Sequence, residues 1–180
     1  PPQSGASYVR NLLEQIVPMK DVRVASLAGR FYAMDRDKRW ERVSEVWDLM
    51  VHGKGRKATD AVQAVEDSYA EGVSDEFIKP VLLEGEDAST LQDGDGLFFY
   101  NFRADRMREL SQAFVDADFT GFDRGRVPQL AAVASMTAYD AHFPLPVAFP
   151  KESVTMGLGE VVSQQGMHQL RLAETEKYAH

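Results

Sequence analysis

The spacing of apolar residues predicts three helices in the first half of the chain. Ser4 or Ser7 can cap the first helix, the second begins near Lys38, and the third runs from a cap at Thr59 to Gly72. The apolar positions that set these periods are Tyr8, Leu12, Leu13 and Ile16 in the first helix, Trp40, Val43, Trp47 and Met50 in the second, and Ala61, Val62, Val65 and Tyr69 in the third.

Shorter apolar runs bounded by turn residues predict strands. These are residues 22–27, 81–83 at a sheet edge, 96–100 and 130–135. The run 96–100 leads into a further helix, in which Met107, Leu110 and Phe114 recur at helical spacing. Strands that alternate with helices predict the α/β class, with an open sheet and flanking helices.

Three prolines near residue 150 predict a boundary or linker, because proline interrupts regular structure. They are Pro144, Pro146 and Pro150. Beyond them, residues 154–165 are predicted to form a helix and residues 170–172 a short strand.

The amino-acid composition of the chain limits the kinds of molecule that it is expected to bind. The 180 residues are 44% hydrophobic, carry a net charge of −8 and include no cysteine. The net negative charge argues against nucleic acid and anionic membranes as partners. Any site that binds an anion must therefore be a local group of cations. The absence of cysteine excludes disulfides and thiolate metal sites, and suits a reducing compartment. We therefore expect a soluble, cytoplasmic protein.

The stretch 101–106, with the sequence NFRADR, lies between the predicted strand 96–100 and the helix that follows it. In open α/β sheets, ligands bind beyond the carboxyl ends of strands, so Arg103 and Arg106 are candidates to bind an anion there. Alternatively, they only pair with Asp105 or with surface carboxylates, the commoner fate of an arginine on a helix. Arg108 is expected to point to water.

A second group of cations has the same topological position. Arg30 and Arg36 are predicted to lie in a loop between the strand 22–27 and the helix that begins near Lys38, with Asp35 or Asp37 as its cap. Alternating charges here are also consistent with a solvated loop. The large apolar neighbours favour a packed loop that holds its arginines in place; they are Phe31, Tyr32, Met34 and Trp40.

Other candidate motifs are weaker. Residues 53–57, the basic turn with the sequence GKGRK, lack the spacing of a phosphate loop and are interpreted as a turn after a helix. Asp140 and His142 have no third ligand nearby and are interpreted as a polar loop pair.

Several long motifs, in the same order along the chain, resemble those of cofactor-independent phosphoglycerate mutases. The main ones are GRFYAMDRDKRWER at 29–42, NFRADR at 101–106 and AETEKYAH at 173–180, with supporting matches at 74–80 and 136–140. The resemblance implies a metal-dependent enzyme of the alkaline phosphatase-like superfamily that interconverts 3-phosphoglycerate and 2-phosphoglycerate. It also implies Mn2+, or Mg2+, and no 2,3-bisphosphoglycerate. The substrate-binding residues that it implies are Arg30, Arg36, Arg103, Asp105, Arg106 and Lys177.

The resemblance further implies that this chain is a fragment. Residues 1–150 would be the C-terminal part of the phosphotransferase domain, inserted into a phosphatase domain, and 151–180 the linker and segment returning to that domain. The serine nucleophile and the metal ligands would lie elsewhere in the parent enzyme, so we expect no catalytic residue here and an inactive fragment. Two alternatives stay open: a non-catalytic phosphoglycerate-binding or anion-binding module, and a related metal-dependent phosphohydrolase.

Overall fold

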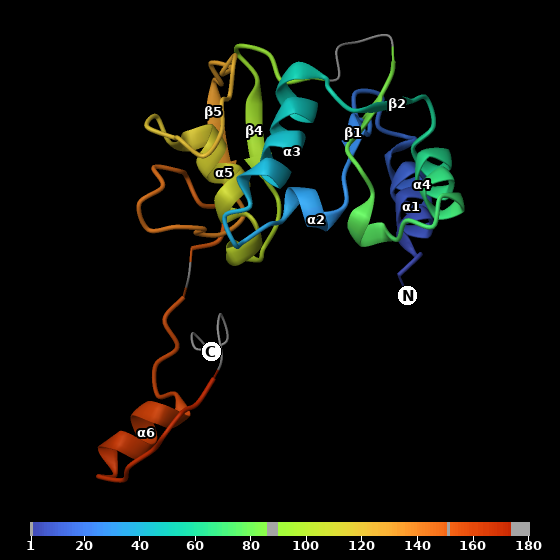
Figure 1. The fold of residues 1–180 in the computed structure, drawn as a ribbon. Helices are drawn as coiled ribbons and strands as arrows, with labels where there is room; N and C mark the ends of the chain where they lie inside the picture. The colour runs from blue at the N-terminus through green and yellow to red at the C-terminus, as the bar shows by residue number, and fades with distance from the viewer. Residues whose placement is uncertain (1, 86–89, 151, 174–180) are drawn as a thin grey trace. The chain divides into compact units, whose positions relative to one another are not determined.

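The structure is a computed structural model that describes residues 2–85, 90–150 and 152–173. It divides into two compact units, Pro1–Pro150 and Lys151–His180 (Figure 1). This division falls where the sequence predicts a domain boundary. The assignment of the two units to different domains of a larger enzyme stays a prediction.

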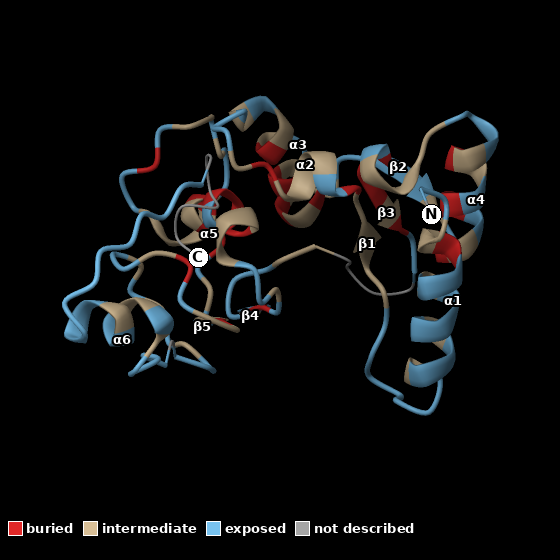
Figure 2. Cartoon of the chain, turned by 90° about the horizontal axis from the view of Figure 1, so that it is seen from below, coloured by how far each residue is buried: buried red, intermediate tan, exposed pale blue. Residues whose placement is uncertain are grey.

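One part of the first unit packs two helices on a three-stranded sheet. The helices are α1 (Gly5–Ile16) and α4 (Ala61–Ala70), and the strands are β1 (Ser26–Leu27), β2 (Arg56–Ala58) and β3 (Val81–Leu83). The sheet order is β1-β3-β2, in which β3 runs antiparallel to β1 and parallel to β2. Figure 2 shows α1 with mostly exposed residues, whereas β3 carries buried ones.

The prediction that 81–83 is an edge strand was wrong, because β3 is the central strand. Pro80 suggested an edge since proline has no N–H for a ladder. It stands one residue before the strand, where only its carbonyl is needed, and that oxygen accepts the Arg56 N–H at 3.0 Å. The partner strand β2 was not predicted, because its residues are polar and largely exposed. Of the predicted strand 22–27, only β1 pairs in the sheet.

A second core in the first unit joins helices α3 (Trp40–His52) and α5 (Arg108–Val115) to the parallel pair β4 (Gly96–Phe99) and β5 (Ala132–Ser135). The strands predicted at 96–100 and 130–135 are thus confirmed, in shorter form. The apolar face of α3 is buried as its period predicts, with Trp47 fully buried. The mixed α/β class is confirmed, although the strands form two small sheets.

The helix ends differ in part from the prediction. Ser4 precedes α1, but the cap is the Asp75 carboxylate, which accepts the N–H groups of Ser4 and Gly5 at 2.9 and 3.1 Å. Thr59 does not cap α4. Asp60, one residue later, accepts the Gln63 N–H at 2.9 Å.

Short helical turns connect these elements and position the arginines. Helix α2 (Arg30–Ala33) replaces part of the predicted loop, and the 3-10 turns η1 (Asp75–Phe77) and η2 (Ala104–Arg106) precede β3 and α5. Gly29, before α2, donates to the Ile78 carbonyl at 2.8 Å. A Cβ at Gly29 would lie 2.3 Å from the Glu76 carbonyl oxygen, so the close approach of these segments requires glycine.

The second unit contains α6 (Leu158–Gln164), which confirms the predicted helix in shorter form. The predicted strand 170–172 was wrong: no strand is described there, and Leu170 and Leu172 are exposed. None of the described residues of this unit is buried. Across the described parts of both units, no helix is long and apolar enough to span a bilayer.

Candidate anion-binding site

The structure brings together two segments that lie far apart in sequence, the loop 34–39 before α3 and the stretch 101–106 after β4. Arg36 Nη1 donates to Asp105 Oδ2 at 2.9 Å. From the other side, Arg103 donates through Nε and Nη2 to the two oxygens of the same carboxylate, at 2.6 and 2.9 Å. Arg106 Nη1 donates to the Met34 carbonyl at 2.8 Å. We call Arg36, Arg103, Asp105 and Arg106 the arginine cluster.

The cluster is partly buried and contains more guanidinium groups than carboxylates among the residues that the structure describes. The side chains of Arg36 and Asp105 are 25% and 23% exposed, whereas that of Arg103 is 62% exposed. Hydrogen bonds from Arg103, and then from Arg36, outweigh burial and lower the pKa of Asp105 to about 2. Asp105 is therefore ionised at neutral pH. Among the described residues of the cluster there are three guanidinium groups and one carboxylate, and guanidinium forks suit a phosphate or carboxylate ligand.

The pairing with Asp105 that the alternative interpretation predicted is present for Arg103, and whether Arg103 also binds an anion stays a prediction. For Arg106, the described residues provide no carboxylate partner, and its bond is to a backbone carbonyl. Of these two arginines, Arg103 therefore has a carboxylate partner, whereas Arg106 binds a backbone carbonyl.

Tyr139 fixes the start of the stretch 101–106. Its hydroxyl group contacts the carbonyls of Phe99 and Asn101 at 3.0 and 2.5 Å, and the side chain is 3% exposed. Burial raises the pKa of Tyr139, so the phenol keeps its hydrogen as a donor. This anchoring role was missed in the sequence, where no local pattern connects residue 139 to the end of β4.

Arg108 is exposed, as predicted, with 49% of its side chain accessible to solvent. Its Nε also donates to the Tyr139 carbonyl at 3.1 Å and lies 3.6 Å from an Asp140 carboxylate oxygen. Arg108 therefore holds the Tyr139 loop against the start of α5.

The loop 34–39 is organised by Asp35, which is 4% exposed. One of its oxygens accepts the N–H groups of Asp37 and Arg39, both at 2.9 Å, and the other accepts the guanidinium groups of Arg39 and Arg42 at 3.2 and 3.4 Å. Burial raises the pKa of Asp35, but the hydrogen bonds from Arg39 and Asp37 outweigh it and lower the pKa below its ordinary value. Asp35 was predicted to cap α3; it instead binds N–H groups that precede the helix.

Two predicted site residues are not part of the cluster in the structure. Arg30 lies on α2, is 58% exposed and pairs with Glu76 of η1 at 3.1 Å. It also lies in a helical turn, where a loop was expected. Lys177 lies outside the described residues. The structure thus joins Arg36, Arg103, Asp105 and Arg106, and leaves the roles of Arg30 and Lys177 as predictions.

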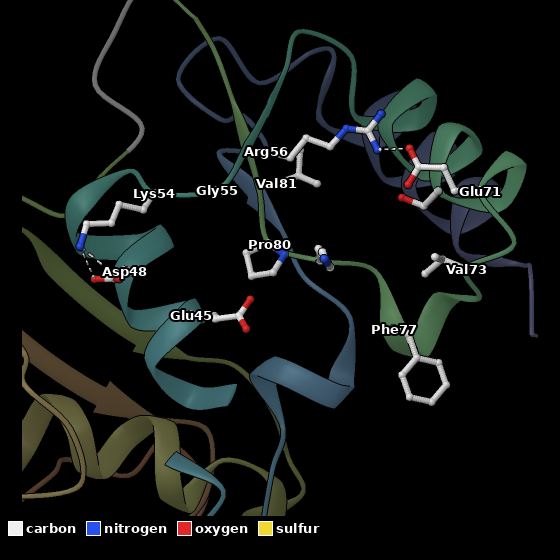
Figure 3. Close-up of a pocket in the computed structure, with 12 residues that line it drawn as sticks. Glu45, Asp48, Lys54, Gly55, Arg56, Glu71, Val73, Phe77, Pro80 and Val81 are labelled. Atoms are coloured by element: carbon white, nitrogen blue, oxygen red, sulfur yellow. Dashed lines mark hydrogen bonds and ion pairs between the residues drawn. The ribbon is translucent and has the colours of Figure 1, made fainter. Parts of the chain in front are cut away.

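A cavity of about 500 Å³ lies beside the basic turn, away from the arginine cluster (Figure 3). Two of the cations that line it pair with carboxylates: Lys54 with Asp48 at 3.2 Å, and Arg56 with Glu71 at 3.3 Å. Arg56 also reaches Asp67 at 2.9 Å. Gly53 ends α3 in the left-handed conformation, which confirms the predicted turn after a helix. We assign no anion site to this cavity.

The described residues do not fit a metal site. No group of three or more histidine or acidic side chains among them could hold an ion. Asp140 and His142 form a pair at 2.9 Å, with the His142 side chain 94% exposed. The interpretation of these two residues as a polar loop pair is confirmed.

The fold and the arginine cluster define the chain as a mixed α/β unit that carries a group of arginines. Comparison with known proteins shows to which family it belongs. A family model described as the BPG-independent PGAM N-terminus matches residues 1–141. Curated proteins named 2,3-bisphosphoglycerate-independent phosphoglycerate mutase are 51% identical in Lawsonia intracellularis and 54% identical in Nitratidesulfovibrio vulgaris, each over 99% of this chain. The chain spans 35% of the length of each relative.

A solved structure agrees with these matches. Leishmania mexicana phosphoglycerate mutase, crystallised at low cobalt concentration, is 31% identical with a TM-score of 0.80. The match covers 91% of this chain and 32% of that one. The chain belongs to the 2,3-bisphosphoglycerate-independent phosphoglycerate mutase family.

Proposed function

We propose that the intact protein containing this chain interconverts 3-phosphoglycerate and 2-phosphoglycerate in the cytoplasm, without 2,3-bisphosphoglycerate. The chain supplies a cationic clamp for the substrate. The observation that carries this proposal is the convergence of Arg36 and Arg103 on Asp105, with Arg106 bound to the Met34 carbonyl of the same loop as Arg36. A phosphoglycerate carries a phosphate and a carboxylate, and guanidinium forks suit both groups.

In this proposal each side chain of the cluster has a physical role. Arg36 and Arg103 are oriented by Asp105, which limits the rotamer freedom that they lose when substrate binds. Arg106 brings a charge that is fixed by a backbone carbonyl and not neutralised by a carboxylate of the described residues. Clamping both ends of a small anion favours phosphoryl transfer by positioning it and by neutralising its charge. Arg30 and Lys177 would complete the clamp.

The rest of the machinery would lie outside this chain. We propose that residues 1–150 belong to a phosphotransferase domain and 151–180 to the segment leading to a phosphatase domain. A bound Mn2+, or Mg2+, would supply Lewis-acid chemistry there. No step of the clamp depends on the metal.

An enolase-coupled assay on the intact protein tests the proposal, with 3-phosphoglycerate, no added bisphosphoglycerate, and with and without a chelator. We expect turnover that the chelator abolishes. Arg106→Ala is expected to lower kcat/KM by about 10- to 100-fold, the value of one or two hydrogen bonds to a charged ligand. The matched control is Arg56→Ala, an arginine of the basic turn with two carboxylate partners, which should change kcat/KM less than about twofold.

The outcomes separate the alternatives. Release of glycerate and inorganic phosphate in place of 2-phosphoglycerate would favour a phosphohydrolase. Binding of 3-phosphoglycerate without turnover, by a folded protein with metal present, would favour a non-catalytic module. An equal loss in Arg106→Ala and Arg56→Ala would contradict the assignment of the clamp.

A further inference from the structure

Glu109 links the two segments of the arginine cluster but belongs to neither. It lies in the first turn of α5 and is 6% exposed. Its Oε1 accepts the backbone N–H of Lys38 at 2.8 Å. Lys38 has φ of +58°, a left-handed conformation that a side-chain-bearing residue keeps only where its surroundings enforce it. Glu109 is therefore one of the groups that fix the loop carrying Arg36.

The second oxygen of Glu109 has an unusual environment. Oε2 is buried and has no hydrogen-bond partner within the described residues. The carboxyl group also lies within side-chain hydrogen-bonding reach of Asp35, which is buried as well. Two ionised carboxylates have no hydrogen to share, so this contact is a hydrogen bond only if one of them is protonated. An ionised Glu109 would instead leave a buried, unpaired negative oxygen beside another negative charge.

We propose that Glu109 is a positioning residue for the substrate clamp and acts as a neutral carboxylic acid. Its Oε1 accepts the Lys38 N–H, and its Oε2–H donates to the Asp35 carboxylate. The proton stays on Glu109 while substrate binds and reacts, and it is lost only as the pH rises. The pair joins α5 to the loop 34–39 and so fixes Arg36 opposite Arg103. This inference rests on the proposed function, because it concerns the same clamp.

The surrounding charges favour a proton on Glu109 and not on Asp35. The charged neighbours recorded for the pair are Asp37, Arg39 and Arg42, on the loop and on α3. Next to the pair in sequence, Arg106 of η2 binds the Met34 carbonyl and Arg108 of α5 binds the Tyr139 carbonyl. Arg39 and Arg42 both donate to Asp35 and so stabilise its ionised form. Burial raises the pKa of Glu109, the Lys38 N–H lowers it in part, and the charge of Asp35 raises it again.

Two substitutions test the proposal in the intact protein. In Glu109→Gln, the amide oxygen can accept the Lys38 N–H and the amide NH2 can donate to Asp35, so the neutral acid is imitated at every pH. Glu109→Leu keeps an apolar side chain of similar size and loses both bonds. At neutral pH we expect the KM for 3-phosphoglycerate to stay within about threefold of wild type in Glu109→Gln and to rise about tenfold or more in Glu109→Leu.

The pH profile separates positioning by a neutral acid from a general structural role. In the wild type, KM should rise on the alkaline side as Glu109 ionises and repels Asp35, and Glu109→Gln should lack that rise. A 13C NMR titration of the glutamate carboxyls should show one signal that titrates above the ordinary range and is absent from Glu109→Gln. Circular dichroism melts establish that each variant is folded.

Each other outcome is decisive. Identical pH profiles for wild type and Glu109→Gln, or a Glu109 carboxyl that titrates in the ordinary acidic range, would overturn the role of the neutral acid. A Glu109→Gln variant that is folded and as impaired as Glu109→Leu would do the same. If the wild type shows no mutase turnover at any pH, the proposed function itself fails, and with it the role in the clamp; the NMR titration then still reports whether Glu109 holds the proton.

Discussion

Two regions of this chain are rich in cations, and they differ in how their charges are balanced. In the basic turn every cation has a carboxylate of its own: Lys54 pairs with Asp48, Lys57 with Glu84, and Arg56 with both Asp67 and Glu71. In the arginine cluster, Arg36 and Arg103 share Asp105, and Arg106 bonds to a carbonyl. Among the described residues, the cluster contains three arginines and one carboxylate, whereas each cation of the basic turn has at least one carboxylate.

The difference between the two regions shows that a group of cations in the sequence does not by itself indicate an anion site. The basic turn is the more conspicuous in sequence, with three cations in five residues next to two glycines. Its partners come from α3, α4 and the segment after β3, and cannot be seen in the local pattern. The ratio of acids to bases after folding decides which region attracts a ligand.

Removing the shared carboxylate should produce the largest effect. We expect Asp105→Asn to lower the free energy of unfolding by about 1–2 kcal/mol, because the largely buried Arg36 and the exposed Arg103 lose their common counter-charge. The matched control in the basic turn is Asp67→Asn. It should cost less than about 0.5 kcal/mol, because Arg56 retains Glu71 and the pair is exposed. Urea unfolding of the 180-residue chain measures both, and equal losses would remove the distinction between the two regions.

The stability that Asp105 contributes should depend on pH, which distinguishes the arginine cluster further from the basic turn. The pKa of Asp105 is lowered in the folded state from 3.8 to about 2. Its stabilisation is therefore fully present above pH 3.8 and is lost as the pH falls toward 2. The shift corresponds to about 2 kcal/mol at most, which we reduce to about 1 kcal/mol because solvent screens the exposed Arg103.

The measurement is the difference in unfolding free energy between wild type and Asp105→Asn. It should shrink steadily from pH 5 to the lowest pH at which both chains stay folded. The same difference for Asp67→Asn should stay small throughout. A gap for Asp105→Asn that does not change with pH would show that the loss comes from packing and not from charge.

Much of the fold follows from the sequence because its signals are local. The helical periods around Trp47 and Leu110, and the short apolar runs before Asn101 and Met136, predict the elements that the structure contains. The failures have a common cause. The polar strand β2, the central place of β3 and the cap that Asp75 provides to α1 all depend on partners distant in sequence.

The candidate site could likewise be predicted from the sequence only in part. Arg36, Arg103 and Arg106 could be proposed from sequence, because each lies at a predicted junction of elements. Most of the hydrogen bonds that fix their geometry join residues far apart in sequence. Arg36 and Asp105 are 69 positions apart, and Arg106 and Met34 are 72 apart, whereas Arg103 and Asp105 are only two apart. Glu109 reads as an ordinary helix residue until its burial is known.

The smallest effects concern two residues in the left-handed conformation, one in each region. Gly53 in the basic turn has φ of +65° and ends α3, whereas Lys38 in the arginine-bearing loop has φ of +58°. Gly53→Ala should lower the free energy of unfolding by about 1 kcal/mol, because alanine strains this conformation and its Cβ would lie 3.2 Å from Thr90 Cγ2.

Lys38→Gly should change the free energy of unfolding by less than about 0.5 kcal/mol, because relief of backbone strain is offset by the greater freedom of glycine in the unfolded chain. The N–H that Glu109 binds is unaffected by the substitution. Urea unfolding of Lys38→Gly, with Gly53→Ala as its counterpart, gives the comparison. A loss of more than about 1 kcal/mol in Lys38→Gly would mean that the lysine side chain itself stabilises the loop, and that the loop depends on more than its bonds to Asp35 and Glu109.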